Sequence, residues 1–186
     1  DGYNYDAYGV STPAPEGYEP TLQIRGEALP CGAFNAPEDV FYAKDENIYI
    51  ADTGNNRIVV LDKAYNFVRQ VNTVVIDGKP EAMEKPNGVY VTNGNMYIVQ
   101  SEKQRVLRCS LDGEVLSQFL RPVSDIFNDE MTYTPIKVLV NNPGTVYVLV
   151  KNFVYGALTY SPEGEFLNYY GSNKVSATLE VLLDYF

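Results

Sequence analysis

The sequence contains no histidine, and this absence excludes several kinds of active site. A catalytic triad with histidine, a histidine-ligated metal and a histidine general base all require an imidazole. Most hydrolase and zinc-enzyme designs are therefore ruled out. The composition leaves enzymatic activity uncertain and favours a binding protein.

Positive charge and long apolar runs are also scarce. Lysine and arginine together number 14, against 24 aspartates and glutamates, so the formal net charge of the 186 residues is −10. Nucleic acids and anionic membranes are bound by clustered lysine and arginine, so we expect neither as a partner. No apolar run approaches the roughly 18 residues of a spanning helix, so we expect no membrane insertion by this segment.

Cysteine is limited to Cys31 and Cys109, which form no CxxC pair. Zinc-ribbon and thioredoxin-like sites therefore have no support. One long-range disulfide remains open, and two buried free thiols are the simpler interpretation. The chain begins at Asp1 without a methionine, which we interpret as a processed start from which any export signal has been removed.

The chain divides into a short leader and a longer folded region. Residues 1–20 (DGYNYDAYGVSTPAPEGYEP) are rich in tyrosine, proline and glycine without periodicity, so we expect an extended N-terminal arm. Apolar residues make up 45% of the sequence, enough for a folded core. We therefore assign residues 21–186 to one domain, or to part of a larger one.

A repeat of about 49 residues organises the folded region. Pro37, Pro86 and Pro135 each open a P-x-x-V unit, and IYI, MYI and VYV follow about ten residues later. Each unit then continues with two more short apolar runs separated by turn residues. A fixed period of this length is typical of propellers and other repeat folds. The sequence predicts an all-β protein with three four-stranded antiparallel blades, at about 38–71, 87–120 and 136–170.

The same pattern predicts which side chains are buried between blades. These are aliphatic residues of the short runs: Ile48, Ile50, Ile58, Val60, Val89, Ile98, Val138 and Val148. The charged residues Lys79, Glu81, Glu84 and Lys85, between the first and second blades, are expected to form a surface loop.

Residues 34–67 closely resemble an NHL repeat. The stretch ADTGNNRI at 51–58 carries the resemblance, which weakens in the second unit and further in the third. The resemblance implies a β-propeller, distantly related to the gluconolactonase and senescence-marker-type lactonases. The leader followed by repeats also resembles secreted bacterial NHL-repeat proteins, which implies a secreted or cell-surface location.

The loop of the first repeat supplies the candidate ligand-binding residues. Asp52, Asn55, Asn56 and Arg57 lie between the expected second and third strands, and Arg105 is the equivalent arginine of the second repeat. These side chains could contact a ligand on one face of the disc. The alternative interpretation is that Asp52 and the asparagines hydrogen-bond the loop's own backbone, and that Arg57 pairs with Asp52 or with a neighbouring blade.

A metal site is the second candidate. Asn87, in PNGV, resembles the asparagine that ligates a divalent cation in the lactonase relatives, and Glu38 lies at the matching place in the first blade. Calcium would need further oxygen ligands, whereas the third blade offers Ile136 and Lys137. An ammonium group there opposes a cation, so we expect no cofactor.

Together these observations predict a non-enzymatic extracellular binding module with an unknown protein or carbohydrate partner. The alternative is a metal-dependent, lactonase-like hydrolase that uses Glu38 and Asn87.

The ring is expected to be incomplete. Closed propellers use about four to eight blades, and four blades of this length need about 196 residues. We therefore expect either half of a longer protein or a homodimer that completes the ring. Residues 21–25 are expected to form an outer strand, and residues 175–186 to start a new apolar segment.

Overall fold

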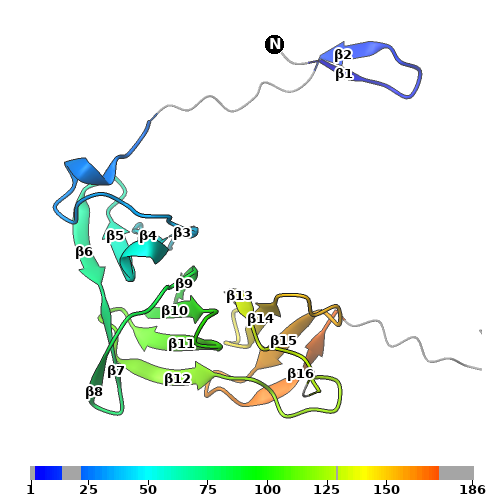
Figure 1. The fold of residues 1–186 in the computed structure, drawn as a ribbon. Coiled ribbons are helices and arrows are strands. Elements are labelled where there is room, and N and C mark those ends of the chain that lie inside the picture. Colours follow the sequence, from blue (N-terminus) through cyan, green and yellow to red (C-terminus); the bar gives the residue numbers. More distant parts are fainter. Residues whose placement is uncertain (1–2, 14–21, 129, 172–186) are drawn as a thin grey trace, which may run out of the picture.

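The computed structural model describes residues 3–13, 22–128 and 130–171, which are all β apart from two single-turn 3-10 helices (Figure 1). Three sheets have four antiparallel strands each, paired in chain order. The prediction of an all-β fold with three four-stranded blades is therefore confirmed.

Each blade runs outward from an inner strand. Blade 1 contains β3 (Asp39–Tyr42), β4 (Ile48–Asp52), β5 (Arg57–Leu61) and β6 (Phe67–Val71). Blade 2 contains β9 (Gly88–Thr92), β10 (Asn95–Gln100), β11 (Arg105–Ser110) and β12 (Val115–Phe119). Blade 3 contains β13 (Pro135–Val140), β14 (Val146–Val150), β15 (Ala157–Tyr160) and β16 (Phe166–Tyr170).

The turns between strands use residues that tolerate a left-handed backbone. Gly113 lies between β11 and β12 with a φ of 96°. A Cβ there would lie 2.8 Å from the carbonyl oxygen of Thr73, so glycine is required by both conformation and space. This turn brings the Gly113 carbonyl to the backbone N–H of Val75, 2.9 Å away.

Two apolar cores lie between consecutive blades. The first joins blades 1 and 2 and includes Tyr49, Ile58 and Ile98, all fully buried. The second joins blades 2 and 3 and includes Phe119 and Val148, also fully buried. The inner strands β3, β9 and β13 lie next to one another (Figure 1). Blade-on-blade packing of this kind explains the nearly continuous apolar runs in the sequence.

The prediction that Ile48 and Ile50 are buried between blades is wrong, because both are only half-buried. Their strand alternates, and Tyr49 and Ala51 face blade 2 instead. Ile48 and Ile50 pair with Tyr42 and Val40, which are 60% and 62% exposed. On the same face, Val59 and Leu61 of β5 are fully buried, so the uncovered part of blade 1 is the part formed by β3 and β4.

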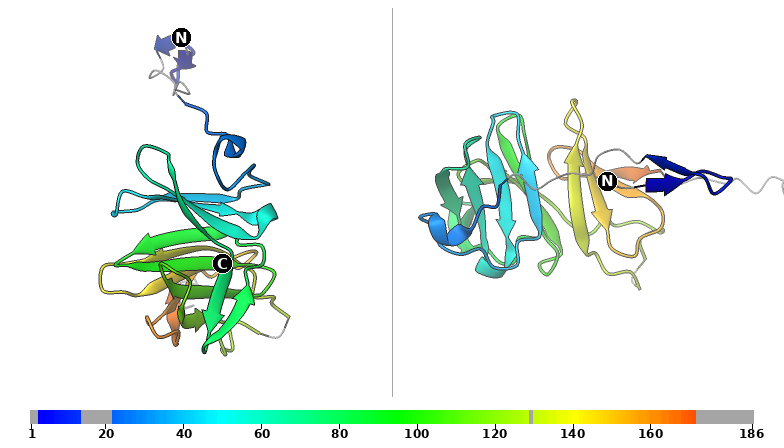
Figure 2. Two further views of the ribbon diagram at one scale, coloured as in Figure 1. Left: turned by 90° about the vertical axis from the view of Figure 1, so that its left-hand side faces the viewer. Right: turned by 90° about the horizontal axis from the view of Figure 1, so that it is seen from above.

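Blade 3 has an equivalent uncovered face. Leu139, Leu149 and Tyr170 are 50%, 42% and 64% exposed, and Tyr147 pairs with Leu139. Blade 1 and blade 3 are separate sheets in the view from above in Figure 2. The described blades therefore form an open ring, whose first and last faces are exposed at the two inner strands of each blade.

The segment between blades 1 and 2 is a hairpin, which corrects the predicted surface loop. Strands β7 (Thr73–Ile76) and β8 (Lys79–Ala82) pair, with Val74 buried in the first core. Asp77 and Gly78 both have positive φ in the turn. An Asp-Gly pair between short strands is a strong hairpin signal, and the sequence displays it at these two residues.

The N-terminal region also differs from an extended arm. Strands β1 (Tyr3–Tyr5) and β2 (Ser11–Pro13) form a hairpin, whose turn is held by the Asp6 carboxylate. Residues 22–25 belong to no described strand, and a 3-10 helix follows at Gly26–Ala28. The apolar segment predicted at 175–186 lies outside the described residues.

Both cysteines are free, so the disulfide interpretation is not supported. Cys109 is buried in the first core, as expected. Cys31 is only half-buried, because it lies in the segment that precedes blade 1.

Candidate functional site

A buried ion pair forms the centre of the blade 1 loop. Arg57 Nε lies 2.7 Å from Asp52 Oδ2, and the Asp52 side chain is fully buried. The other carboxylate oxygen accepts the backbone N–H of Asn35 at 2.7 Å. Asn55, in the 3-10 helix Thr53–Asn55, donates to Asp52 at 2.9 Å. The carboxylate is therefore fully engaged by its own chain.

The remaining donors of Arg57 hold the segment that leads into blade 1. The guanidinium donates to the carbonyls of Cys31 and Ala33, at 2.5 Å and 3.0 Å, and to the side chain of Gln70. Asn55 donates to the same Ala33 carbonyl at 2.9 Å. Three of the predicted ligand-binding residues thus anchor residues 31–35 to the blade.

Asn56 connects blade 1 to the start of blade 2. Its backbone is left-handed, with a φ of 55°, and its side-chain oxygen accepts the backbone N–H of Lys85 at 2.8 Å. An asparagine suits both requirements, because it tolerates this conformation and offers a carbonyl.

Arg105 occupies the equivalent place in blade 2, where the neutral amide of Gln100 stands in place of the Asp52 carboxylate. Its Nε donates to Gln100 Oε1 at 2.9 Å, and Nη2 lies 2.5 Å from Glu81 Oε1 on β8. Lys103 reaches the same Glu81 oxygen at 2.8 Å. Hydrogen bonds from Lys103 and Arg105 lower the pKa of Glu81 below its ordinary value. Here too the arginine joins the blade to its preceding segment.

In blades 1 and 2, the residue that follows Asp52 or Gln100 carries a hydroxyl group that links the blade to the next one. Thr53 Oγ1 donates to the carbonyl of Pro86 at 2.7 Å, and Ser101 Oγ donates to the carbonyl of Pro135. These prolines open blades 2 and 3. In blade 3 the matching position is Lys151, which has no hydroxyl.

Another ion pair spans the inner strands of blades 1 and 3. Lys137 Nζ lies 2.5 Å and 2.6 Å from the two oxygens of Asp39. Asp39 also accepts the backbone N–H of Val89, on the inner strand of blade 2, at 2.9 Å. One carboxylate therefore connects all three inner strands.

Beside these strands lies a hollow of about 260 Å³, which we call the axial hollow. It is lined by residues that open the blades and by residues of the loops between second and third strands: Glu38, Thr53, Lys85, Asn87, Ser101, Glu102, Thr134, Ile136 and Lys151. Glu38 and Asn87, the predicted metal residues, therefore lie in one cavity. Lys85 and Glu102 form an exposed pair there, 2.7 Å apart.

The residues of the axial hollow do not form a typical calcium site. Among the described residues, no three histidine, cysteine, aspartate or glutamate side chains gather where they could hold a metal. Asn87 Oδ1 accepts the backbone N–H of Ser101 at 2.9 Å, which occupies one of the two lone pairs of the oxygen that would ligate a cation. Hard cations need several converging oxygen ligands, and this arrangement offers few.

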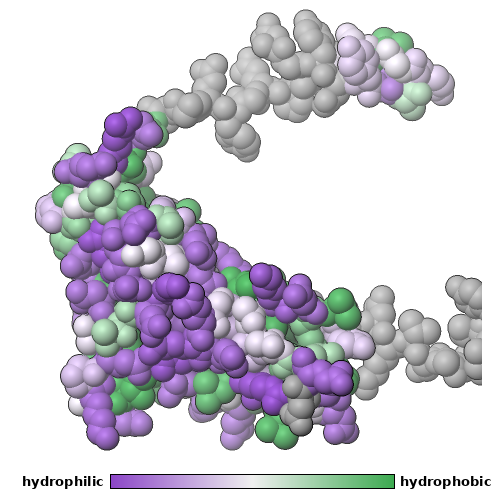
Figure 3. Space-filling model, in the orientation of Figure 1, coloured by the Kyte–Doolittle hydropathy of each residue, from purple (hydrophilic) through white to green (hydrophobic). Residues whose placement is uncertain are grey.

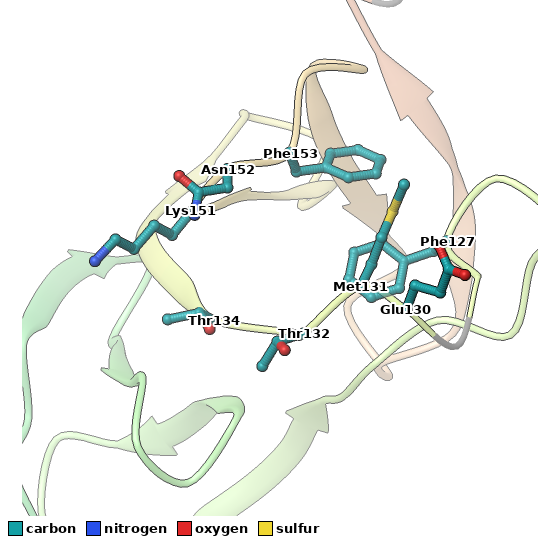
Figure 4. A pocket seen from close by; sticks show the side chains of 8 residues that line it. All are labelled: Phe127, Glu130, Met131, Thr132, Thr134, Lys151, Asn152 and Phe153. Atoms are coloured by element: carbon teal, nitrogen blue, oxygen red, sulfur yellow. The ribbon is translucent and has the colours of Figure 1, made fainter.

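A second hollow, of about 280 Å³, adjoins the first and shares Thr134 and Lys151 with it. We call it the aromatic hollow; it is lined also by Phe127, Glu130, Met131, Thr132, Asn152 and Phe153. In Figure 4 the Lys151 side chain points away from Phe127 and Met131, toward the green ribbon of blade 2. Lys151 thus lies where the two hollows meet.

The Lys151 side chain makes no hydrogen bond or ion pair within the part of the chain that the structure describes. Glu38 makes no side-chain hydrogen bond with those residues, but its charge adds to that of Glu102 in raising the pKa of Lys85. Glu38 was named from the sequence only as a candidate metal ligand, and Lys151 was not identified. Aligning the repeats places Lys151 at the position of Thr53 and Ser101. The substitution of lysine for a linking hydroxyl is the signal that could have identified it.

Hydrophilic residues cover most of the visible blade surface, with hydrophobic patches between them (Figure 3). No helix in the described ranges is long and apolar enough to cross a membrane.

Comparison with known proteins supports the repeat assignment. A family model for the NHL repeat matches residues 34–61. Hydrazine synthase of Kuenenia stuttgartiensis aligns with a TM-score of 0.54 and 13% identity, over 84% of this chain and 40% of that one. A catalytically inactive virginiamycin B lyase of Staphylococcus aureus, crystallised with quinupristin, aligns with a TM-score of 0.52 and 12% identity, over 89% and 46%.

Because the sequence identities are low, these alignments establish the fold and nothing about function. The chain spans less than half the length of both structures. No curated protein matches the sequence.

Proposed function

We propose that this chain, which carries an NHL repeat at residues 34–61 on a β-propeller fold, is a non-enzymatic binding module whose ligand occupies the axial hollow. One observation carries the proposal. The polar groups of the repeat motif are engaged by the chain itself, whereas Glu38 and Lys151, from blades 1 and 3, are exposed and line the same cavity. Concave sites with a few convergent polar groups are typical ligand sites.

The test uses printed arrays of peptides and glycans, probed with the 186-residue protein. Ile136 is 42% exposed and lines the hollow, so Ile136→Trp fills the cavity. Leu116, 53% exposed on β12 and outside both hollows, provides the matched control Leu116→Trp. We expect Ile136→Trp to abolish binding and Leu116→Trp to preserve it. Binding that both variants retain contradicts the proposal.

A metal-dependent lactonase-like hydrolase is the second candidate, because Glu38 and Asn87 line one cavity. It is opposed by the absence, among the described residues, of any group of three acidic, histidine or cysteine side chains that could hold a metal. Metal analysis of the purified protein and a lactone hydrolysis assay separate the two candidates. Stoichiometric calcium together with calcium-dependent hydrolysis would favour the enzyme.

We also propose a secreted or cell-surface location, on the resemblance of the leader and repeats to secreted NHL-repeat proteins. Fractionation of the native cells tests this location. Recovery of the protein from the cytoplasm alone contradicts it.

The uncovered faces of blades 1 and 3 support a further proposal about assembly. A second copy would bring its blade 3 against blade 1 of the first, and the reverse, so that two chains close one ring. The exposed apolar residues of both faces are the kind that the two inner cores bury. Light scattering and the dependence of stability on protein concentration test this assembly.

A further inference from the structure

We infer that Asn93 is a site of spontaneous chemical modification, at which the asparagine converts to aspartate and isoaspartate through a cyclic imide. The sequence contains two Asn-Gly pairs, one at residues 87 and 88 and one at residues 93 and 94. The structure holds the first pair in place and leaves the second open to the reaction.

The reaction needs only the two residues and water. The backbone nitrogen of Gly94 attacks the side-chain carbonyl carbon of Asn93 and forms a C–N bond. The side-chain amide group leaves as ammonia, taking the proton of the attacking nitrogen, and a five-membered imide remains. Water opens this ring at either carbonyl, which gives aspartate or isoaspartate. Glycine favours the attack, because no side chain shields its nitrogen.

The second pair forms the turn between β9 and β10. Asn93 and Gly94 have φ values of 49° and 72°, as a two-residue type I′ turn requires, and both are exposed. Within the described ranges, neither the Asn93 side-chain amide nor the Gly94 backbone N–H makes a hydrogen bond. The attacking nitrogen and the carbonyl that it attacks are therefore both accessible.

The first pair is held by its surroundings. Asn87 is half-buried, and its Oδ1 accepts the backbone N–H of Ser101 at 2.9 Å. Gly88 is buried at the start of β9, where it pairs with Val99. A Cβ on Gly88 would lie 2.8 Å from the Val99 side chain, so little room surrounds this backbone. Reaction at Asn87 therefore requires local opening of the start of β9.

Isoaspartate at position 93 is expected to destabilise blade 2. Its main chain runs through the side-chain methylene, which adds an atom to a turn of two residues. The turn joins Thr92 to Asn95, which pair across the hairpin, and the length of such a loop sets the register of its strands. Strand β9 contacts the inner strands β3 and β13, so an altered register would affect all three blades.

This modification is independent of the proposed binding function, because Asn93 and Gly94 line neither hollow. A loss of ligand binding by the axial hollow variant and a change in the rate of modification are therefore separate results.

The experiment incubates the 186-residue protein at pH 8 and 37 °C, in buffer and in guanidinium chloride. Trypsin releases both Asn-Gly pairs in one peptide, residues 70–103, because Lys79 and Lys85 each precede a proline. Fragment ions in mass spectrometry then distinguish modification at Asn87 from modification at Asn93 after identical handling.

In buffer we expect Asn93 to be modified at least about tenfold faster than Asn87, because only Asn87 needs local opening of the fold. In guanidinium chloride the two rates should be similar, since the turn and the hydrogen bond to Ser101 are lost. A ratio of rates that is no larger in buffer than in guanidinium chloride overturns the inference. Modification of neither residue in buffer, when both react in guanidinium chloride, also overturns it.

Two variants connect the modification to stability. Asn93→Gly cannot form the imide, and Gly-Gly also suits a type I′ turn, so its urea midpoint should stay constant during the incubation. The midpoint of the unaltered protein should fall as isoaspartate accumulates. Freshly prepared Asn93→Asp carries the new charge on an unaltered main chain and should resemble the fresh protein. Equal losses in the unaltered protein and Asn93→Gly, or a fresh Asn93→Asp as unstable as the incubated protein, contradict the role of the isoaspartyl main chain.

Discussion

Breaking the buried pair of Asp52 and Arg57 should be strongly destabilising, because it leaves a buried charge uncompensated, and Arg57→Met tests this. The substitution keeps an unbranched side chain of similar reach but removes the charge. It leaves the Asp52 carboxylate, which is fully buried, without its ionic partner. It also removes the donors that hold the carbonyls of Cys31 and Ala33.

The cost can be estimated from the burial of the pair. The Arg57 side chain is 10% exposed and that of Asp52 is 0% exposed, so solvent screens the interaction little. Removing one partner of such a pair costs about 3–5 kcal/mol. Because a shift of 1 kcal/mol changes the melting temperature of a domain this size by about 2–4 °C, we expect a drop of roughly 6–20 °C.

Two further variants give smaller expected losses of unfolding free energy, with which Arg57→Met can be compared. Arg105→Met leaves the neutral amide oxygen of Gln100 unsatisfied, at a cost of about 1–3 kcal/mol, while Glu81 keeps Lys103 as its ionic partner. Lys63→Met breaks an exposed pair with Glu46, with both side chains at least 60% exposed, and such pairs contribute about 0–1 kcal/mol.

Urea denaturation should therefore rank the losses Arg57→Met, then Arg105→Met, then Lys63→Met. In the double variant Asp52→Asn, Arg57→Met, the loss should be smaller than the sum of the single losses, because neither charge is left alone. A loss for Arg57→Met that equals that of Lys63→Met would refute the argument that the pair stabilises the loop.

Two other predictions concern titratable groups. Burial raises the pKa of the Cys109 thiol to about 12. At pH 8 a thiol reagent should therefore modify only the half-buried Cys31 in the native protein, and both cysteines after unfolding. Modification of neither cysteine after unfolding would indicate a disulfide. The pKa of Glu81 is lowered from 4.5 by Lys103 and Arg105, so its stabilising effect is present above pH 4.5 and is lost as the pH falls through the lowered pKa. The difference in unfolding free energy between the unaltered protein and Glu81→Gln should therefore shrink below pH 4.5, and a difference that grows on acidification contradicts this.

The repeat pattern made the blades predictable because each strand carries its own signal. β-branched and aromatic residues in short runs, with Asp-Gly or Glu-Gly turns between them, specify the strands locally. The 49-residue spacing of Pro37, Pro86 and Pro135 then aligns three such units. Both signals are present even in the third unit, where the loop motif is absent.

The site was less predictable because it depends on contacts between distant segments. Asp52 and Arg57 could be expected to pair, but their contacts with residues 31–35 follow from tertiary structure. The neighbouring positions of Glu38 and Lys151 likewise require three blades around one axis. Lys137 was expected to oppose a cation near Asn87, and the structure places it on Asp39.

Ile50 was predicted to be buried between blades, and it is not, because no further blade of the described part of the chain covers its face. Ile50, Ile98 and Val148 occupy the same position in their repeats, yet only Ile98 and Val148 are fully buried, because blades 1 and 2 cover them. Ile98→Ala should therefore cost about 2–5 kcal/mol, and Ile50→Ala less than about 2 kcal/mol in a single chain.

If a second copy covers the face of blade 1, the cost of Ile50→Ala must depend on protein concentration, because assembly adds to stability by mass action. We expect it to be small where light scattering gives the mass of one chain, 20.8 kDa, and to approach that of Ile98→Ala where the mass doubles. Ile98→Ala is the control, since its neighbours belong to the same chain at every concentration. A chain that remains monomeric throughout, with a small and constant cost at Ile50, contradicts closure of the ring by a second copy, and the uncovered faces would then need further blades or another partner.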